Sequence, residues 1–240
     1  MLIFLALCWI LIKIDYVLAN TEKTIFLGPP ETTIPGSEPN LETLQLLSLT
    51  PQEWSLRTEL PRSFPSIQAP LGNTSVFLLD GLRTGQRYEV RICWIATEPT
   101  DFTLRTYTLT EVFDTPELIQ ALAAEAEERH SYLEHNVLEN PEGARDLRSA
   151  TEDYNSGAVT ALFLIVSSAA AFYSTNQSLM LDPPPVLVDI ILDPYLLNIF
   201  PRSLVPTAVY LVGLAVGGWW LSWFVWKWLA SIVEPKSHTD

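Results

Sequence analysis

The stretch DGLRTGQRYEVRICW, residues 80–94, indicates the fold class of this chain of 240 residues. Its second half alternates between apolar and polar side chains. Because successive side chains of a strand point to opposite faces, the alternation predicts a sheet with one buried face and one face in water. The apolar face holds Tyr88, Val90, Ile92 and Trp94, and the polar face holds Glu89, Arg91 and Cys93.

The spacing of Leu82, Gly85 and Tyr88 resembles the turn into the penultimate strand of a fibronectin type III domain. In that fold a tyrosine near the start of the strand bonds back to the preceding corner. Further strand patterns come from KTIFL, TSVFLL and DFTLRTYTLTEVF, which are separated by turn signals. Residues 20–112 are therefore expected to form a mainly β lumenal domain, an immunoglobulin- or fibronectin III-like sandwich.

Composition excludes several classes of function. The formal net charge is −14, and no cluster of Lys or Arg provides the basic patch that a nucleic acid requires. The mean hydropathy is nevertheless positive, at +0.18, so apolar and acidic stretches must be separated along the chain. Of the two cysteines, Cys8 lies in a segment expected to be removed, which leaves Cys93 without an internal disulfide partner.

The N-terminus carries an apolar run from residue 2 to residue 12, too short to span a bilayer. Val17 and Ala19 are small residues at the −3 and −1 positions of a cut before Asn20, so residues 1–19 are predicted to be a signal peptide. The missing basic residue before the run leaves a buried N-terminal strand as the alternative.

At Thr115 the apolar period changes to that of a helix, with Pro116 at the first helical position. Residues 113–155 are predicted to form an acidic amphipathic helix and linker. From residue 111 to residue 155 there are twelve acidic and three basic residues. This excess of negative charge favours a helix face exposed to solvent. The more specific alternative is a surface that binds a basic partner or a metal. The expected apolar stripe is Leu118, Leu122, Ala126, Leu133 and Val137, with His130 beside it.

Two apolar segments are candidates for the membrane. Residues 203–226 carry no charge, and we expect a transmembrane helix over 203–228, followed by a short tail at 229–240. Residues 156–175 are left open between a second span and a buried or interfacial helix. Between them lies the Pro-rich apolar lead-in to the final helix, residues 176–202. It is expected to lie against a membrane surface or a partner protein.

The final helix carries the candidate docking residues for a membrane partner. Small residues four apart allow close helix approach, and crowded tryptophans either anchor one end at the interface or add to a docking face. These candidates are Gly213, Gly217, Gly218, Trp219, Trp220 and Trp223.

No catalytic, cofactor-binding or metal-binding set emerges from the motifs. His130 and His135 lie five apart, without the spacing of a zinc-binding helix. Two glycosylation sequons begin at Asn73, expected in a turn and the better acceptor, and at Asn176. If the chain crossed the membrane at 156–175, Asn176 would lie in the cytosol and stay unmodified.

The overall layout resembles one family, carried by NTEKTIFLGP at residues 20–29, DPYLLNIFPRSLVPT at 193–207 and the Trp-rich C-terminal helix. It is similar to the fungal co-activator subunit of GPI mannosyltransferase II, the ER enzyme that adds the second mannose to GPI precursors. The resemblance implies a non-catalytic partner of a multi-pass, dolichol-phosphate-mannose-dependent transferase. It also implies residence in the ER membrane with the N-terminal domain in the lumen.

Two other interpretations are open at this stage. The chain could be a membrane-tethered lumenal binding or quality-control module for client proteins or glycans. A cell-surface adhesion protein is disfavoured by the short tail and by the missing disulfides.

Overall fold

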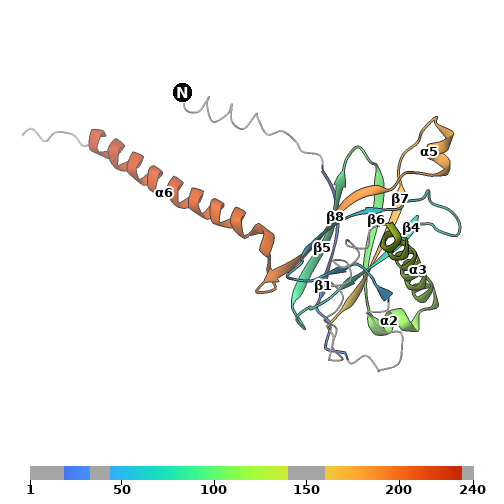
Figure 1. Cartoon of the computed structure of the whole chain (residues 1–240). Helices are drawn as coiled ribbons and strands as arrows, with labels where there is room; N and C mark the ends of the chain where they lie inside the picture. Colours follow the sequence, from blue (N-terminus) through green and yellow to red (C-terminus); the bar gives the residue numbers. More distant parts are fainter. Residues whose placement is uncertain (1–18, 33–43, 140–159, 234–240) are drawn as a thin grey trace, which may run out of the picture. The chain divides into compact units, whose positions relative to one another are not determined.

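The computed structural model describes residues 19–32, 44–139 and 160–233 (Figure 1). The chain divides into two compact units, one ending at Pro194 and one beginning at Tyr195, and each is described by itself. The first unit is mostly β with two sheets, and the second contains an apolar helix long enough to cross a membrane, as the sequence predicts. The predicted signal peptide lies outside the described residues, except for Ala19, which begins the first strand.

The first sheet has the strand order β1-β5-β8-β3, and every neighbouring pair is antiparallel. A short strand, β9, pairs with the end of β8. The bounds of these strands are β1 Ala19–Leu27, β3 Ser55–Leu60, β5 Arg87–Ile95, β8 Val186–Leu196 and β9 Phe200–Pro201.

The second sheet has the order β2-β4-β7-β6. Only the two-residue strand β2 runs parallel to its neighbour; the other pairs are antiparallel. The bounds are β2 Ser48–Leu49, β4 Asn73–Leu79, β6 Thr100–Thr108 and β7 Leu162–Ala170.

One hydrophobic core lies between the two sheets. Val90 and Ile92 of β5 enter it from the first sheet, and Phe77 of β4 and Leu164 of β7 enter it from the second. The predicted alternation of β5 is confirmed, since Tyr88, Val90 and Ile92 are all fully buried. Each strand thus gives the core every second side chain, and the remaining side chains form the outer faces of the domain.

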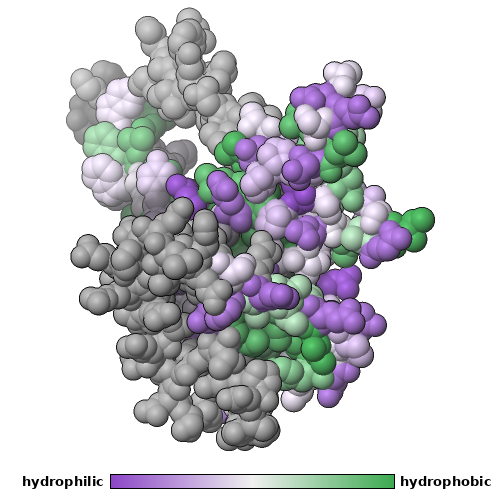
Figure 2. Space-filling model, turned by 45° about the vertical axis from the view of Figure 1, so that its right-hand side comes forward, coloured by the Kyte–Doolittle hydropathy of each residue, from purple (hydrophilic) through white to green (hydrophobic). Residues whose placement is uncertain are grey.

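Two helices cover the outer face of the second sheet. α2, Leu109–Asp114, begins with a reciprocal cap in which Thr108 and Glu111 bond each other's backbone N–H. α3, Pro116–Glu139, follows it and packs Leu122 against Phe163 of β7 in a second apolar cluster. Figure 2, turned to bring the α3 side of Figure 1 forward, shows hydrophobic residues reaching the surface among hydrophilic ones. This outer face is therefore already occupied within the chain.

The acidic helix is confirmed from residue 116 to residue 139, but its surroundings differ from the expectation in two respects. The stretch TLTEVF does not continue β6, because the cap at Thr108 turns it into α2. Glu125 of α3 is also not merely solvated, since its carboxylate accepts a bond of 3.2 Å from the backbone N–H of Val76. The linker 140–155 and the side chains of Leu133 and Val137 lie outside the description.

The corner predicted from Leu82, Gly85 and Tyr88 is present. The backbone N–H of Arg83 donates to Tyr88 Oη over 2.9 Å, and the ring of Tyr88 is buried. Gly85 has φ +72°, in the left-handed region that favours glycine. The corner also closes on Gly28, where an added Cβ would lie only 2.1 Å from the carbonyl oxygen of Arg83.

Tyr88→Phe tests this corner. The ring would stay in the core while the Arg83 N–H loses its acceptor, so we expect a loss of about 1 kcal/mol. In a chain of this size that corresponds to a melting temperature lower by about 2–4 °C, measured on the full chain in detergent. Tyr173→Phe is the matched control, because Tyr173 is 85% exposed and should tolerate the change.

The largest correction concerns residues 156–175, for which a membrane-spanning or interfacial helix was expected. Leu162–Ala170 is instead the strand β7, and all nine of its residues are buried. One face packs on the core through Leu164 and Val166, and the other carries Phe163 under the helices. A strand buried on both faces is apolar throughout, which gives it the composition of a span.

The predicted lead-in, residues 176–202, is also corrected over most of its length. It begins with a short helix, α5, Gln177–Leu181, and continues as β8, whose Val188 and Ile190 lie in the core. The β domain therefore extends well beyond residue 112. The expectation of an exposed apolar lead-in is met at the turn between β8 and β9, where Leu197 is 92% exposed with φ +53°.

The second unit consists mainly of one helix. After the 3₁₀ turn Arg202–Leu204, α6 runs from Val205 to Val233. The segment Arg202–Ile232 is the one helix among the described residues that is long and apolar enough to cross a membrane. At about 1.5 Å per residue its 31 residues exceed the thickness of a bilayer core.

Candidate functional site

The outer face of the first sheet is the candidate site in the β domain. Helices cover the equivalent face of the second sheet, whereas no described helix packs on this one. Its side chains come from the polar positions of β5 and from their cross-strand partners on β1 and β8. The register places Lys23 opposite Arg91, and Glu89 opposite Asp193.

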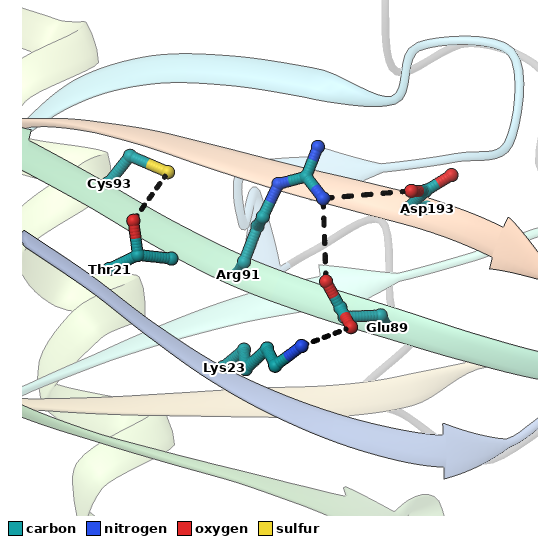
Figure 3. Close-up of polar contacts among 6 residues, drawn as sticks. All are labelled: Thr21, Lys23, Glu89, Arg91, Cys93 and Asp193. Atoms are coloured by element: carbon teal, nitrogen blue, oxygen red, sulfur yellow. Dashed lines mark hydrogen bonds and ion pairs between the residues drawn. The ribbon is translucent and has the colours of Figure 1, made fainter. Parts of the chain in front are cut away.

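Four of these side chains form a continuous charge ladder, which we define as Lys23, Glu89, Arg91 and Asp193. Figure 3 shows Arg91 between the two carboxylates, with Lys23 on the other side of Glu89. Lys23 Nζ lies 3.0 Å from Glu89 Oε2, Arg91 Nη1 lies 3.4 Å from Glu89 Oε1, and the same nitrogen lies 3.6 Å from Asp193 Oδ2. Two positive and two negative charges therefore cancel within the ladder.

The carboxylates of the ladder are buried although they belong to an outer face. The side chains of Glu89 and Asp193 are 4% and 5% exposed, while those of Lys23 and Arg91 are 56% and 23% exposed. A buried carboxylate without a partner is strongly destabilising. Glu89 is paired with Lys23 and Arg91, and Asp193 is paired with Arg91. The expected wet side of β5 is thus a layer of paired charges with only the cations reaching water.

A second row of polar contacts crosses the same face. Arg57 of β3 makes a bidentate pair with Asp189 of β8, Nε to Oδ1 at 2.7 Å and Nη2 to Oδ2 at 2.8 Å. These hydrogen bonds hold the pKa of Asp189 below its ordinary value. Next in the row, Thr21 Oγ1 donates to Cys93 Sγ over 3.6 Å (Figure 3). Cys93 is a free thiol.

Apolar side chains flank the ladder at both ends of the face. Ile25 and Leu27 of β1 are 51% and 57% exposed on one side, and Ile95 and Leu187 are exposed on the other. A polar centre whose charges are already paired, with apolar residues around it, can be covered by a partner without leaving an unpaired charge. This arrangement is suited to binding another protein surface.

The sequence predicts only part of this face. The alternation of β5 puts Glu89, Arg91 and Cys93 on one side, but it does not connect them with Asp189 and Asp193 of β8. Those aspartates lie four apart in an apolar segment, on one face of a strand, and that spacing was the available signal.

The predicted docking residues of the membrane helix all lie on α6. An added Cβ at Gly213, Gly217 or Gly218 would meet nothing within 4 Å, so the helix surface is open at each glycine. Trp219, Trp220 and Trp223 are exposed as well, and Lys227 Nζ lies 4.1 Å from the ring centroid of Trp223. A docking role for these residues remains a proposal.

The other candidate residues lie in the first unit, outside its first sheet. Asn73 begins β4 and Asn176 caps α5, so both sequons belong to the first unit. His130 and His135 lie on α3. Within the described ranges, no group of three or more His, Cys, Asp or Glu side chains is arranged to hold a metal ion.

One comparison with known proteins is decisive. The family model described as Pga1, GPI-mannosyltransferase II co-activator, matches residues 10–118. Residues 10–118, under half of the chain, are similar to this family. The match confirms the resemblance predicted from the sequence and covers β1 to β6 with three members of the charge ladder, Lys23, Glu89 and Arg91. No curated protein and no solved structure matches the chain.

The Pga1 match also fixes the general class of function. Pga1 proteins are non-catalytic accessory subunits, which confirms the prediction that the chain is not an enzyme. The family places the chain in GPI-anchor biosynthesis, and its candidate membrane span agrees with the ER membrane, where that family acts.

Proposed function

We propose that the chain stabilises and activates the catalytic subunit of the mannosyltransferase that adds the second mannose to GPI precursors. The observation that carries the proposal is the match of residues 10–118 to the co-activator family. In this proposal the first unit lies in the ER lumen, and α6 spans the membrane beside the helices of the catalytic subunit.

Contact within the membrane is assigned to the glycine face of α6. Gly213 and Gly217 lie one turn apart on the same side of the helix, and no side chain covers them. In lipid, helices associate by close packing at small residues, because burial of apolar surface gives no advantage there. A helix of the catalytic subunit is the partner that the family match supports.

Contact in the lumen is assigned to the outer face of the first sheet. The family-matched segment supplies β1 and β5, and therefore Ile25, Leu27 and most of the charge ladder. The opposite outer face of the domain is occupied by α2 and α3. Lumenal loops of the catalytic subunit are thus the proposed occupant of the first-sheet face.

The covalent link between the two surfaces strengthens both contacts. Once α6 is bound in the membrane, the lumenal contact becomes intramolecular and benefits from a high effective concentration. Two individually weak contacts can then hold one partner, which is what an accessory subunit of a membrane enzyme requires.

Stabilisation is tested by the lifetime of the catalytic subunit. Depletion of the chain should shorten the half-life of that subunit several-fold after protein synthesis is blocked, because an unpartnered subunit is removed by quality control. Ile25→Ser with Leu27→Ser should have the same effect, since both side chains are exposed on the proposed contact face.

The matched control for that variant is Ile67→Ser, which changes a 97% exposed isoleucine outside the strands of the face. It should leave the half-life unchanged. If depletion leaves the half-life unchanged, stabilisation is wrong. If depletion shortens the half-life but the Ile25 and Leu27 variant supports a normal half-life, the first-sheet face is not the contact. Recovery of many unrelated proteins with the chain would favour the binding or quality-control module.

A further inference from the structure

The two sequons of the first unit differ in a way that the sequence does not reveal. Both lie at the same end of the domain, because Asn73 of β4 pairs with Ser168 near the end of β7, and β7 leads directly into the loop that carries Asn176. With β7 buried as a strand, no membrane crossing separates them, so both lie on one side of the membrane.

Asn73 is poorly placed to carry a glycan in the folded domain. In β4 it alternates in phase with Phe77 and Leu79, which enter the core between the sheets, whereas Val76 and Leu78 face the helices. Asn73 is half-buried, and its backbone carbonyl accepts a hydrogen bond from Ser168 Oγ over 3.4 Å. A glycan on this inward-facing side chain would have to extend outward from between the two sheets.

Asn176 has the opposite surroundings. Asn176 and Ser178 are both exposed, on the loop between β7 and β8. Asn176 Oδ1 accepts from the backbone N–H of Ser178 at 3.1 Å and from Ser178 Oγ at 2.8 Å. Both of these bonds use the oxygen, so the amide nitrogen Nδ2, the atom that a glycan joins, makes no hydrogen bond among the described residues.

We infer that Asn176 is the N-glycosylated residue of this chain and that Asn73 is unmodified. The donor is an oligosaccharide carried on a polyprenyl diphosphate in the ER membrane. The bond from sugar C1 to the diphosphate oxygen breaks, and the lipid diphosphate leaves with the electron pair. C1 then bonds to Asn176 Nδ2, which gives up one proton to base.

The position of this glycan has a consequence for partner binding. The α5 loop lies at the start of β8, whereas the chain leaves the first unit at Pro194, which pairs with Tyr88 at the other end of the sheet. A glycan at Asn176 therefore keeps the α5 end in water and leaves the charge ladder accessible to a partner protein. The inference rests on the lumenal placement of the first unit, which is part of the proposed function.

The test is the gel mobility of the full chain from microsomes before and after endoglycosidase digestion. Digestion should lower the apparent mass of the unaltered chain by one step, the mass of a single glycan. This step should be absent in Asn176→Gln and present in Asn73→Gln. Ser178→Ala should also abolish the step, while Ser178→Thr, which keeps the hydroxyl of the sequon, should retain it. Asn176 and Ser178 are exposed, so these variants should fold.

Three results would overturn the inference: no mobility step in the unaltered chain, two steps that show glycans on both sequons, or a step that is lost with Asn73→Gln and kept with Asn176→Gln. Labelled GPI precursors from the same cells give a separate readout. A normal step with a normal precursor pattern would support the glycan and contradict the co-activator role, so the two failures can be told apart.

Discussion

Arg91→Met is expected to lower the free energy of unfolding by about 3 kcal/mol, the lower end of the range for breaking a buried ion pair. The physical reason is that Arg91 contacts both Glu89 and Asp193, whose carboxylates are almost fully buried. Methionine fills part of the space but leaves both negative charges without this cation. For a chain of this size the melting temperature should fall by about 6–12 °C, measured on the full chain in detergent.

The matched control is Arg57→Met on the same face of the same sheet. Arg57 pairs with Asp189 in good geometry, but its side chain is 70% exposed. Exposed pairs contribute little to stability because water and salt screen them, so this variant should melt within a few degrees of the unaltered chain. Equal effects of the two substitutions would contradict the account of the ladder as a buried network.

A compensated variant separates the cost of unpaired charge from the loss of packing. Glu89→Leu and Asp193→Leu added to Arg91→Met remove both carboxylates that lose Arg91, and apolar replacement of a buried ion network is often neutral in stability. The triple variant should therefore recover most of the loss in melting temperature. If it melts as low as Arg91→Met alone, side-chain packing rather than charge determines the stability of this face.

Gly213→Leu with Gly217→Leu is expected to reduce co-purification of the catalytic subunit about tenfold, a loss of about 1.4 kcal/mol. Leucine at both positions adds side chains where the helix surface is now flat, and so prevents close approach of a neighbouring helix. Insertion of α6 itself should be unaffected, because leucine is more favourable than glycine in the hydrocarbon region. The measurement is quantitative co-purification in mild detergent.

The control for the glycine pair is Val212→Leu with Val216→Leu, which keeps the same spacing on a different side of α6. This variant should co-purify normally. Undiminished co-purification with the glycine variant would exclude this face from the contact, whereas equal losses in both variants would indicate a general disturbance of the helix.

The sequence predicts strands well where only one face of the strand is buried. β5 alternates clearly, because its outer face carries Glu89 and Arg91 over a buried inner face. β7 is buried on both faces, so it shows no alternation, and periodicity cannot separate such a strand from a buried or membrane helix. Its place between β4 and β6 follows only from tertiary pairing.

The candidate site could be predicted only in part for a related reason. Glu89 and Asp193 come together when β8 enters the sheet beside β5, and local pattern carries no information about that pairing. α6 is different, because its residues need no tertiary partner to be recognised: length and lack of charge suffice. The membrane helix and its glycines were therefore predictable, and the charge ladder was not.

The measurement that tests the central claim most directly is the pattern of labelled GPI precursors after depletion of the chain, separated by chromatography. The co-activator account predicts that the precursor with one mannose accumulates and that the species with two mannoses is lost. Restoring the full chain should restore the second mannose. An unchanged precursor pattern in depleted cells would contradict the account.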